Sequence, residues 1–106
     1  MPKSTPWGPA QSQRKLADGI TLYTTASHGG IQLSNERYSR MPVLETPYSK
    51  NGWYEEDVDW AFVALTYPEA FNPEAIEAAR NTLQWAYEGR YRWISKYGYN
   101  PYQPVV

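Results

Sequence analysis

The sequence contains no cysteine among its 106 residues. This absence excludes disulfides, thiolate nucleophiles and zinc sites built on thiolates, and it is typical of proteins from a reducing compartment. The longest strongly apolar run, residues 60–65, is too short to cross a bilayer, and residues 1–10 lack the apolar stretch of a signal peptide. We therefore expect a cytoplasmic protein without a membrane partner, folded as a single domain over residues 1–106.

Histidine and net charge are also scarce, with one histidine, His28, and a formal net charge of −1. The charges are nevertheless segregated, because residues 45–77 hold eight of the eleven acids and one of the ten basic residues. Such segregation can steer a charged partner toward one side of a protein. It can equally reflect exposed faces of neighbouring elements that differ in sign, and the sequence does not separate these two interpretations.

Aromatic residues are abundant, and tyrosine dominates them, with ten Tyr and five Trp against two Phe. A buried Tyr or Trp needs a partner for its polar group, whereas exposed ones are typical of interfaces. We therefore expect some of the tyrosines to lie at a recognition surface.

The first half of the chain predicts a β-hairpin. Residues 1–15, with prolines at positions 2, 6 and 9, are expected to form an extended arm that Trp7 anchors to the body. Residues 20–26 alternate between apolar and polar side chains, which is typical of a strand. Residues 27–30 then form a turn and residues 30–33 a second strand, which places His28 at the tip of the hairpin.

The second half predicts helices. Ser34 is a suitable N-cap for a short helix through Arg40, and residues 53–54 are expected to form a brief strand. The acidic segment that follows is expected to start a helix, with residues 55–57 in its first turn, which ends before Pro68. Asn72 and Pro73 open another helix, and residues 98–106 form a Pro/Tyr-rich tail. The predicted class is α+β, a small antiparallel sheet or β-hairpin packed against two to three helices.

The segment Ser27–His28–Gly29–Gly30 is the first candidate site. Glycine in a tight turn supplies positive φ and lets a ligand approach the backbone. The free amides of Gly29 and Gly30 could then hold an oxyanion or phosphate, with His28 as the proton donor. An isolated histidine is more often only a local hydrogen-bonding group in a structural turn, and that alternative stays open.

The second candidate site is an acidic cluster flanked by aromatic residues. On a helix, Glu55 and Asp59 share a face, and Glu56 can also approach Asp59. Two carboxylates with the imidazole of His28 could hold a divalent metal ion and activate water for hydrolysis. Alternatively, the acids only complement a helix dipole or form ion pairs with Arg37 and Arg40.

A basic and aromatic segment near the C-terminus allows nucleic-acid binding as a weaker hypothesis. Cations interleaved with aromatic rings are typical of single-strand binders, and here the residues are Arg90, Arg92, Trp93 and Lys96. An amphipathic helix explains the same residues at least as well.

Three segments carry a family resemblance: Thr5–Gly8, Ala26–Gly30 followed by Leu33, and Gly52–Ala61. Together they resemble an uncharacterised family of small domains from bacteriophages, plasmids and other mobile elements, over about residues 5–87. The family pattern often has cysteine where this chain has Val58, so a thiol role is not carried over. The resemblance brings no activity with it. It implies a mobile-element accessory protein, a context in which anti-defence roles are common, and it suggests that the two central motifs form one site.

Two functions are therefore expected. The first is protein binding in the host cytoplasm, including inhibition of a host defence complex, with a host protein as partner and no obligatory cofactor. The alternative is a metal-dependent hydrolase or nuclease that uses His28, Glu55, Glu56 and Asp59. Either way, the predicted binding patch consists of Ser27, His28, Gly29, Gly30, Trp53, Tyr54, Glu55, Glu56, Asp57 and Asp59.

Overall fold

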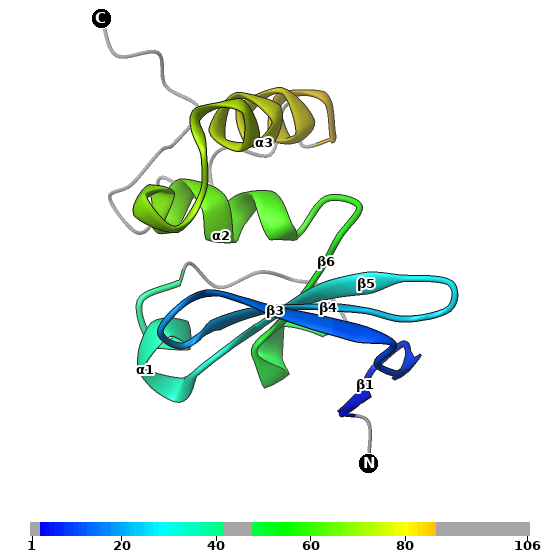
Figure 1. The fold of residues 1–106 in the computed structure, drawn as a ribbon. Coiled ribbons are helices and arrows are strands. Elements are labelled where there is room, and N and C mark those ends of the chain that lie inside the picture. Colours follow the sequence, from blue (N-terminus) through cyan, green and yellow to red (C-terminus); the bar gives the residue numbers. More distant parts are fainter. Residues whose placement is uncertain (1–2, 42–47, 87–106) are drawn as a thin grey trace, which may run out of the picture.

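A computed structural model describes residues 3–41 and 48–86 of the chain (Figure 1). The strands are β1 (Ser4–Thr5), β2 (Gly8–Pro9), β3 (Ser12–Ala17), β4 (Ile20–Thr24), β5 (Gly29–Leu33) and β6 (Trp53–Glu55). The α-helices are α1 (Asn35–Tyr38), α2 (Trp60–Thr66) and α3 (Pro73–Ala86), and two short 3₁₀ turns are η1 (Ser49–Asn51) and η2 (Pro68–Ala70).

The central element is an antiparallel sheet with the strand order β3-β4-β5-β6. Leu22 lies opposite Ile31, and Ile31 lies opposite Tyr54, so these three side chains share one face. The next row, Tyr23, Gly30 and Glu55, therefore points to the other face. The predicted hairpin and the α+β class are confirmed.

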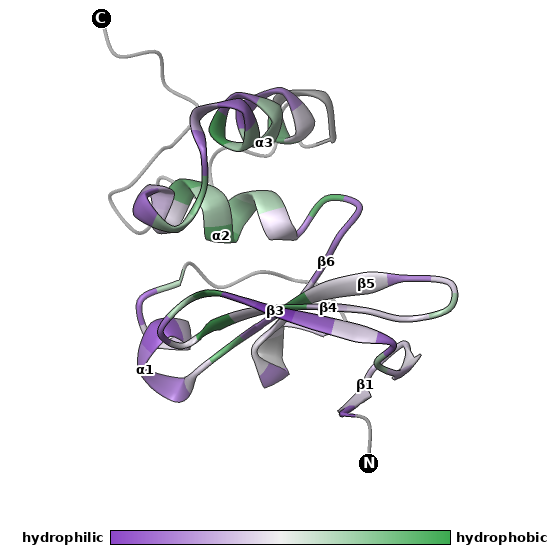
Figure 2. Cartoon of the chain, in the orientation of Figure 1, coloured by the Kyte–Doolittle hydropathy of each residue, from purple (hydrophilic) through white to green (hydrophobic). Residues whose placement is uncertain are grey.

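The main core lies between the sheet and the helices. Helix α2 covers one face of the sheet, and α3 packs on the outer side of α2 (Figure 1). Five consecutive residues of α2, 61–65, are buried, as expected of a helix sandwiched between two layers. The strongly apolar segments of the chain gather in this layer (Figure 2), where they meet Ile20, Ile31 and Leu83.

The N-terminal residues are more regular than the expected extended arm. Strands β1 and β2 form a two-stranded hairpin, and residues 12–15 belong to the edge strand β3. The Thr5 hydroxyl donates to the Gly8 carbonyl (2.7 Å) and accepts from the Trp7 amide (3.1 Å), which closes the turn. Gly8 has φ 113°, a conformation that a side chain would strain. The expectation that Trp7 anchors this segment is confirmed.

Trp7 contributes to a second, smaller aromatic cluster. Its ring makes edge contacts with Tyr48 (5.3 Å between centroids) and Trp53 (5.7 Å), and Trp53 also contacts Tyr23 (5.5 Å). Tyr23 and Trp53 alternate in register with the core residues, so this cluster covers the sheet face opposite α2. The sheet is therefore packed on both faces, by helices on one and by aromatic rings on the other.

The predicted capping residues occupy the predicted places. Ser34 accepts from the Arg37 amide at the start of α1, and Asn72 Oδ1 accepts from the Ala75 amide (2.8 Å) with Pro73 at the first position of α3. Helix α2, however, begins at Trp60 rather than within the acidic segment. None of the helices within residues 3–41 and 48–86 has the length and apolar character needed to span a membrane.

Candidate functional site

The turn between β4 and β5 places His28 at the end of the sheet. The side chain of buried Thr25 donates to the His28 carbonyl (2.9 Å) and accepts from the His28 amide (3.0 Å). The Thr25 amide donates to the same carbonyl (2.7 Å), so three hydrogen bonds join these two residues. Thr25 therefore fixes the backbone from which the imidazole extends, a positioning role that the sequence pattern did not reveal.

The second part of the site comes from β6 and the turn after it. Glu55 is the last residue of β6. The backbone amide of the next residue, Glu56, donates to the Gly29 carbonyl (3.0 Å), and this hydrogen bond connects the turn after β6 to the start of β5. His28 Nδ1 lies 3.8 Å from Glu55 Oε1. One ligand atom from each of His28, Glu55 and Asp57 lies within 4.8 Å of the others. We call these three residues the His–Glu–Asp cluster.

Burial and neighbouring negative charges alter the pKa of one member of the His–Glu–Asp cluster, Glu55. Burial raises the pKa of the Glu55 carboxyl above its ordinary value, and the neighbouring charges of Asp57 and Asp59 raise it further. A hydrogen bond with Asp57 acts in the same direction, whereas His28 lowers the pKa. The Glu55 side chain is 27% exposed and that of His28 46% exposed, so the cluster is shielded on one side and open to solvent on the other.

The cluster has the donor chemistry of a divalent cation site. One imidazole nitrogen and two carboxylates suit Mn²⁺, Zn²⁺ or Fe²⁺, which accept mixed nitrogen and oxygen ligands. Ligand atoms bound at about 2.1 Å to one ion lie roughly 3–4 Å apart, a spacing that the His28–Glu55 pair already has. Small side-chain rotations would bring Asp57 to the same ion, because Asp57 is exposed in a turn.

Two residues of the predicted acidic site, Glu56 and Asp59, are not part of the group whose ligand atoms lie within 4.8 Å of one another, although the charge of Asp59 acts on Glu55. Glu56 points to the opposite side of the sheet, where it lines a groove beside Trp60. Asp59 is buried, with 6% exposure, and lies close enough to Tyr54 to raise its pKa. The expected helical spacing of Glu55 and Asp59 is wrong, because Glu55 belongs to a strand whose pairing with β5 prevents a helix from starting there.

The expected ion pairs between the arginines and this acidic segment are replaced by other pairs. Arg37 lies 3.7 Å from Glu69 and stacks over the Tyr67 ring, and Arg40 lies 3.8 Å from Glu36 within and just after α1. Within the described part of the chain, no ion pair joins an arginine to the His–Glu–Asp cluster.

Gly29 and Gly30 also differ from expectation. Both are buried in β5, between β4 and β6, and neither has positive φ. Their backbones belong to the sheet, so the predicted anion site on free turn amides is not formed, whereas Ser27 is exposed in the turn. A Cβ on Gly30 would overlap the Trp7 ring and lie 2.6 Å from the Tyr54 carbonyl oxygen. These glycines permit close packing, not ligand access.

The aromatic residues near the site divide between the two faces. Trp53 is buried in the Trp7 cluster on the face of Glu55, whereas Tyr54 is fully buried in the core on the other face. The described tyrosines (Tyr23, Tyr38, Tyr48, Tyr54 and Tyr67) are buried or half-buried, so the expected exposed tyrosines are not found among them. The remaining five, the basic segment with Arg90, Arg92, Trp93 and Lys96, and the tail at 98–106 lie outside the described residues.

Comparison with known proteins gives one match. Residues 1–103 match the family described as "Domain of unknown function (DUF7007)". No curated protein and no solved structure matches the chain. The match covers almost the whole sequence, including both motifs of the candidate site. The chain therefore belongs to this uncharacterised family of small domains, DUF7007.

Proposed function

We propose that the protein is a binding protein whose His–Glu–Asp cluster holds a divalent cation. The observation that carries this proposal is the convergence of His28, Glu55 and Asp57, with ligand atoms within 4.8 Å of one another. The residues come from two strand ends that are 27 positions apart along the chain, from 28 to 55, and the sheet pairing brings them together. Local sequence alone therefore does not account for their proximity.

The charge balance supports a cation rather than an anion. Burial raises the pKa of Glu55, and repulsion from the Asp57 carboxylate raises it further. A bound cation would relieve the repulsion and would lower the pKa of Glu55. Nitrogen and oxygen donors without thiolates suit Mn²⁺ or Zn²⁺. Because the third ligand, Asp57, is exposed, the site is open to solvent, unlike an enclosed structural metal site.

The biological role that we propose is that of a small accessory protein of a phage or other mobile element. It would act in the host cytoplasm by binding a host protein, including a component of a defence system. Support comes from the resemblance of the Thr5–Gly8, Ala26–Gly30 and Gly52–Ala61 segments to domains from such elements. The cation would then order the turn and the acidic loop that carry the recognition surface.

A metal-dependent hydrolase or nuclease is the second candidate function. Three protein ligands leave coordination positions on the ion for water, which hydrolysis needs. The half-exposed imidazole of His28 also leaves the ion accessible from solvent. The catalytic set would be His28, Glu55 and Asp57, in place of the expected Glu56 and Asp59. Hydrolysis of bis(p-nitrophenyl) phosphate in the presence of Mn²⁺, abolished by His28→Ala, would support this candidate; absence of turnover by a cation-loaded protein would favour binding alone.

Calorimetric titration with Mn²⁺, Zn²⁺ and Mg²⁺ tests the proposed cation site. We expect binding of Mn²⁺ or Zn²⁺ by the wild type, and a loss of affinity of about tenfold or more in His28→Ala and in Asp57→Asn. Glu77→Gln is the matched control, because Glu77 is exposed on α3, outside the cluster. Equal affinity in all four proteins, or no binding by the wild type, would contradict the proposal.

A further inference from the structure

We propose that the free edge of β3 and the groove beside it bind an extended segment of a partner protein that carries an acidic residue two positions from a bulky apolar residue. The inference rests on the proposed role in protein binding, but not on the cation. It concerns a surface separate from the His–Glu–Asp cluster, since β3 and β6 are the opposite edges of the sheet.

The first step is the exposed strand edge. Strand β3 is the outermost strand of the sheet, and its first four residues, 12–15, are exposed. Among residues 3–41 and 48–86, the backbone of β3 forms hydrogen bonds only with β4. Two basic residues, Arg14 and Lys15, and a register shift between Lys15 and Ala17 are features that disfavour pairing with an identical edge. A segment of opposite charge can still add to residues 12–15 through main-chain hydrogen bonds.

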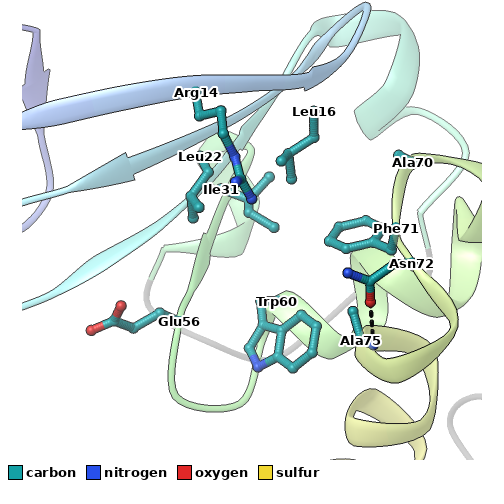
Figure 3. Close-up of a pocket in the computed structure, with 10 residues that line it drawn as sticks. All are labelled: Arg14, Leu16, Leu22, Ile31, Glu56, Trp60, Ala70, Phe71, Asn72 and Ala75. Carbon is teal, nitrogen blue, oxygen red and sulfur yellow. Dashed lines mark hydrogen bonds between the residues drawn. The ribbon is translucent and has the colours of Figure 1, made fainter.

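The second step is the groove that adjoins this edge (Figure 3). Its volume is about 380 Å³, near the lower end of the range of ligand pockets, roughly 300–1,000 Å³. Leu16, Leu22 and Ile31 form the sheet side. Trp60 and Phe71, with ring centroids 6.2 Å apart, form the opposite wall. Such a space suits a bulky apolar side chain of the added strand.

The third step is the charge at the groove. Figure 3 shows the Arg14 side chain extending from β3 into the space between the sheet and Trp60. The Arg14 side chain forms no ion pair with an acidic residue of the described part of the chain. The Glu56 carboxylate points away from Trp60 in the same view, and Asn72 uses its oxygen to cap α3. A carboxylate of the partner would complement Arg14 and could accept a hydrogen bond from the Asn72 amide.

The spacing follows from strand geometry. Arg14 and Leu16 are two positions apart and line the same groove, so they share one face of β3. Residues of an added strand that face them are also two positions apart. An acid opposite Arg14 and a bulky apolar residue opposite Leu16 give the proposed pattern, with its direction set by whether the added strand runs parallel or antiparallel.

Selection from a library of random linear peptides displayed on yeast tests this inference. The enriched peptide is then synthesised and labelled, and its binding to the full chain is measured. We expect enrichment of an acidic and a bulky apolar residue two positions apart, and amide shift changes on residues 12–17. Arg14→Glu should weaken binding by about tenfold or more. The control Lys15→Glu, on the same strand but the opposite face, should change it by less than about twofold.

Each other outcome overturns the inference. It fails if no peptide is enriched, if the enriched peptides lack the spacing, or if Arg14→Glu binds as well as the wild type. It also fails if the edge is occupied by a second copy, seen as self-association that Arg14→Glu abolishes. A peptide whose binding is lost in His28→Ala would move recognition to the His–Glu–Asp cluster, and the proposed protein-binding role would stand without this surface.

Discussion

Tyr54 is a fully buried residue directly behind the site, with its hydroxyl unpaired among the residues that the structure describes. Its neighbour in the chain, Glu55, belongs to the His–Glu–Asp cluster on the opposite face of the sheet. Burial raises the pKa of Tyr54 well above its ordinary value of 10.0, and the charges of Tyr38, Asp59 and Tyr67 raise it further. An unpaired buried hydroxyl contributes little to stability, so the benefit of this side chain lies in its ring.

The raised pKa of Tyr54 predicts loss of stability in alkali. Above pH 10 the unfolded chain releases this proton while the folded protein keeps it, so the free energy of unfolding falls by up to about 1.4 kcal/mol per pH unit. Below pH 10 the residue contributes no pH dependence. Tyr54→Phe should therefore reduce the slope above pH 10, measured by urea unfolding, and should leave stability at neutral pH equal or higher by up to about 1 kcal/mol.

Part of the alkaline slope should persist in this variant, because burial also raises the pKa of Tyr67, whose hydroxyl donates to the Arg37 carbonyl (2.7 Å). An identical slope in wild type and Tyr54→Phe would refute the assignment to Tyr54.

Strand β5 shows how one element serves both faces of the sheet. Ile31 and Leu33 enter the helical core, while Gly30 leaves room for Trp7 on the opposite face. The close approach of Trp7 holds the N-terminal hairpin to the sheet, and it depends on the absence of a side chain at position 30. Gly30 thereby links the N-terminal segment to the strand that follows the His28 turn.

Gly30→Ala should destabilise the protein by about 1–3 kcal/mol, because its Cβ would overlap the Trp7 ring and the Tyr54 carbonyl oxygen would be 2.6 Å away. Displacement of Trp7 should also move the tryptophan emission to longer wavelength. Gln32→Ala is the matched control, two residues along the same strand and on the same face. Chemical denaturation of both variants checks the prediction, and equal stability would show that Trp7 is not held at Gly30.

The same elements show what the sequence could predict. The hairpin, the Ser34 and Asn72 caps and the strand at residues 53–54 follow from local patterns, and the structure has all of them. Strand β3 escaped prediction because residues 12–15 are polar and exposed, so no apolar alternation marks them. The start of α2 was predicted too early, because acidic residues are favourable in the first turn of a helix. The pairing that instead makes Glu55 part of a strand is with Gly30, a residue far away in the sequence, so no local pattern indicates it.

For the molecule as a whole, the candidate site is a product of topology. The sequence predicted that His28 and the acidic segment form one site, and the structure brings His28, Glu55 and Asp57 together at one end of the sheet. It could not show which acids belong there, because strand alternation sends Glu55 to one face and Glu56 to the other. The fold thus carries two separate surfaces, an acidic cluster with one imidazole and a groove beside the basic edge strand β3.

Cation binding by the His–Glu–Asp cluster is the central claim, and paramagnetic broadening by Mn²⁺ tests it most directly. Substoichiometric Mn²⁺ added to isotope-labelled protein should first broaden the signals of His28, Glu55 and Asp57, while those of α3 stay sharp. Excess Zn²⁺, which is diamagnetic, or a chelator should restore the broadened signals. Uniform broadening, or broadening that begins at exposed acids such as Glu74 and Glu77, would contradict the account.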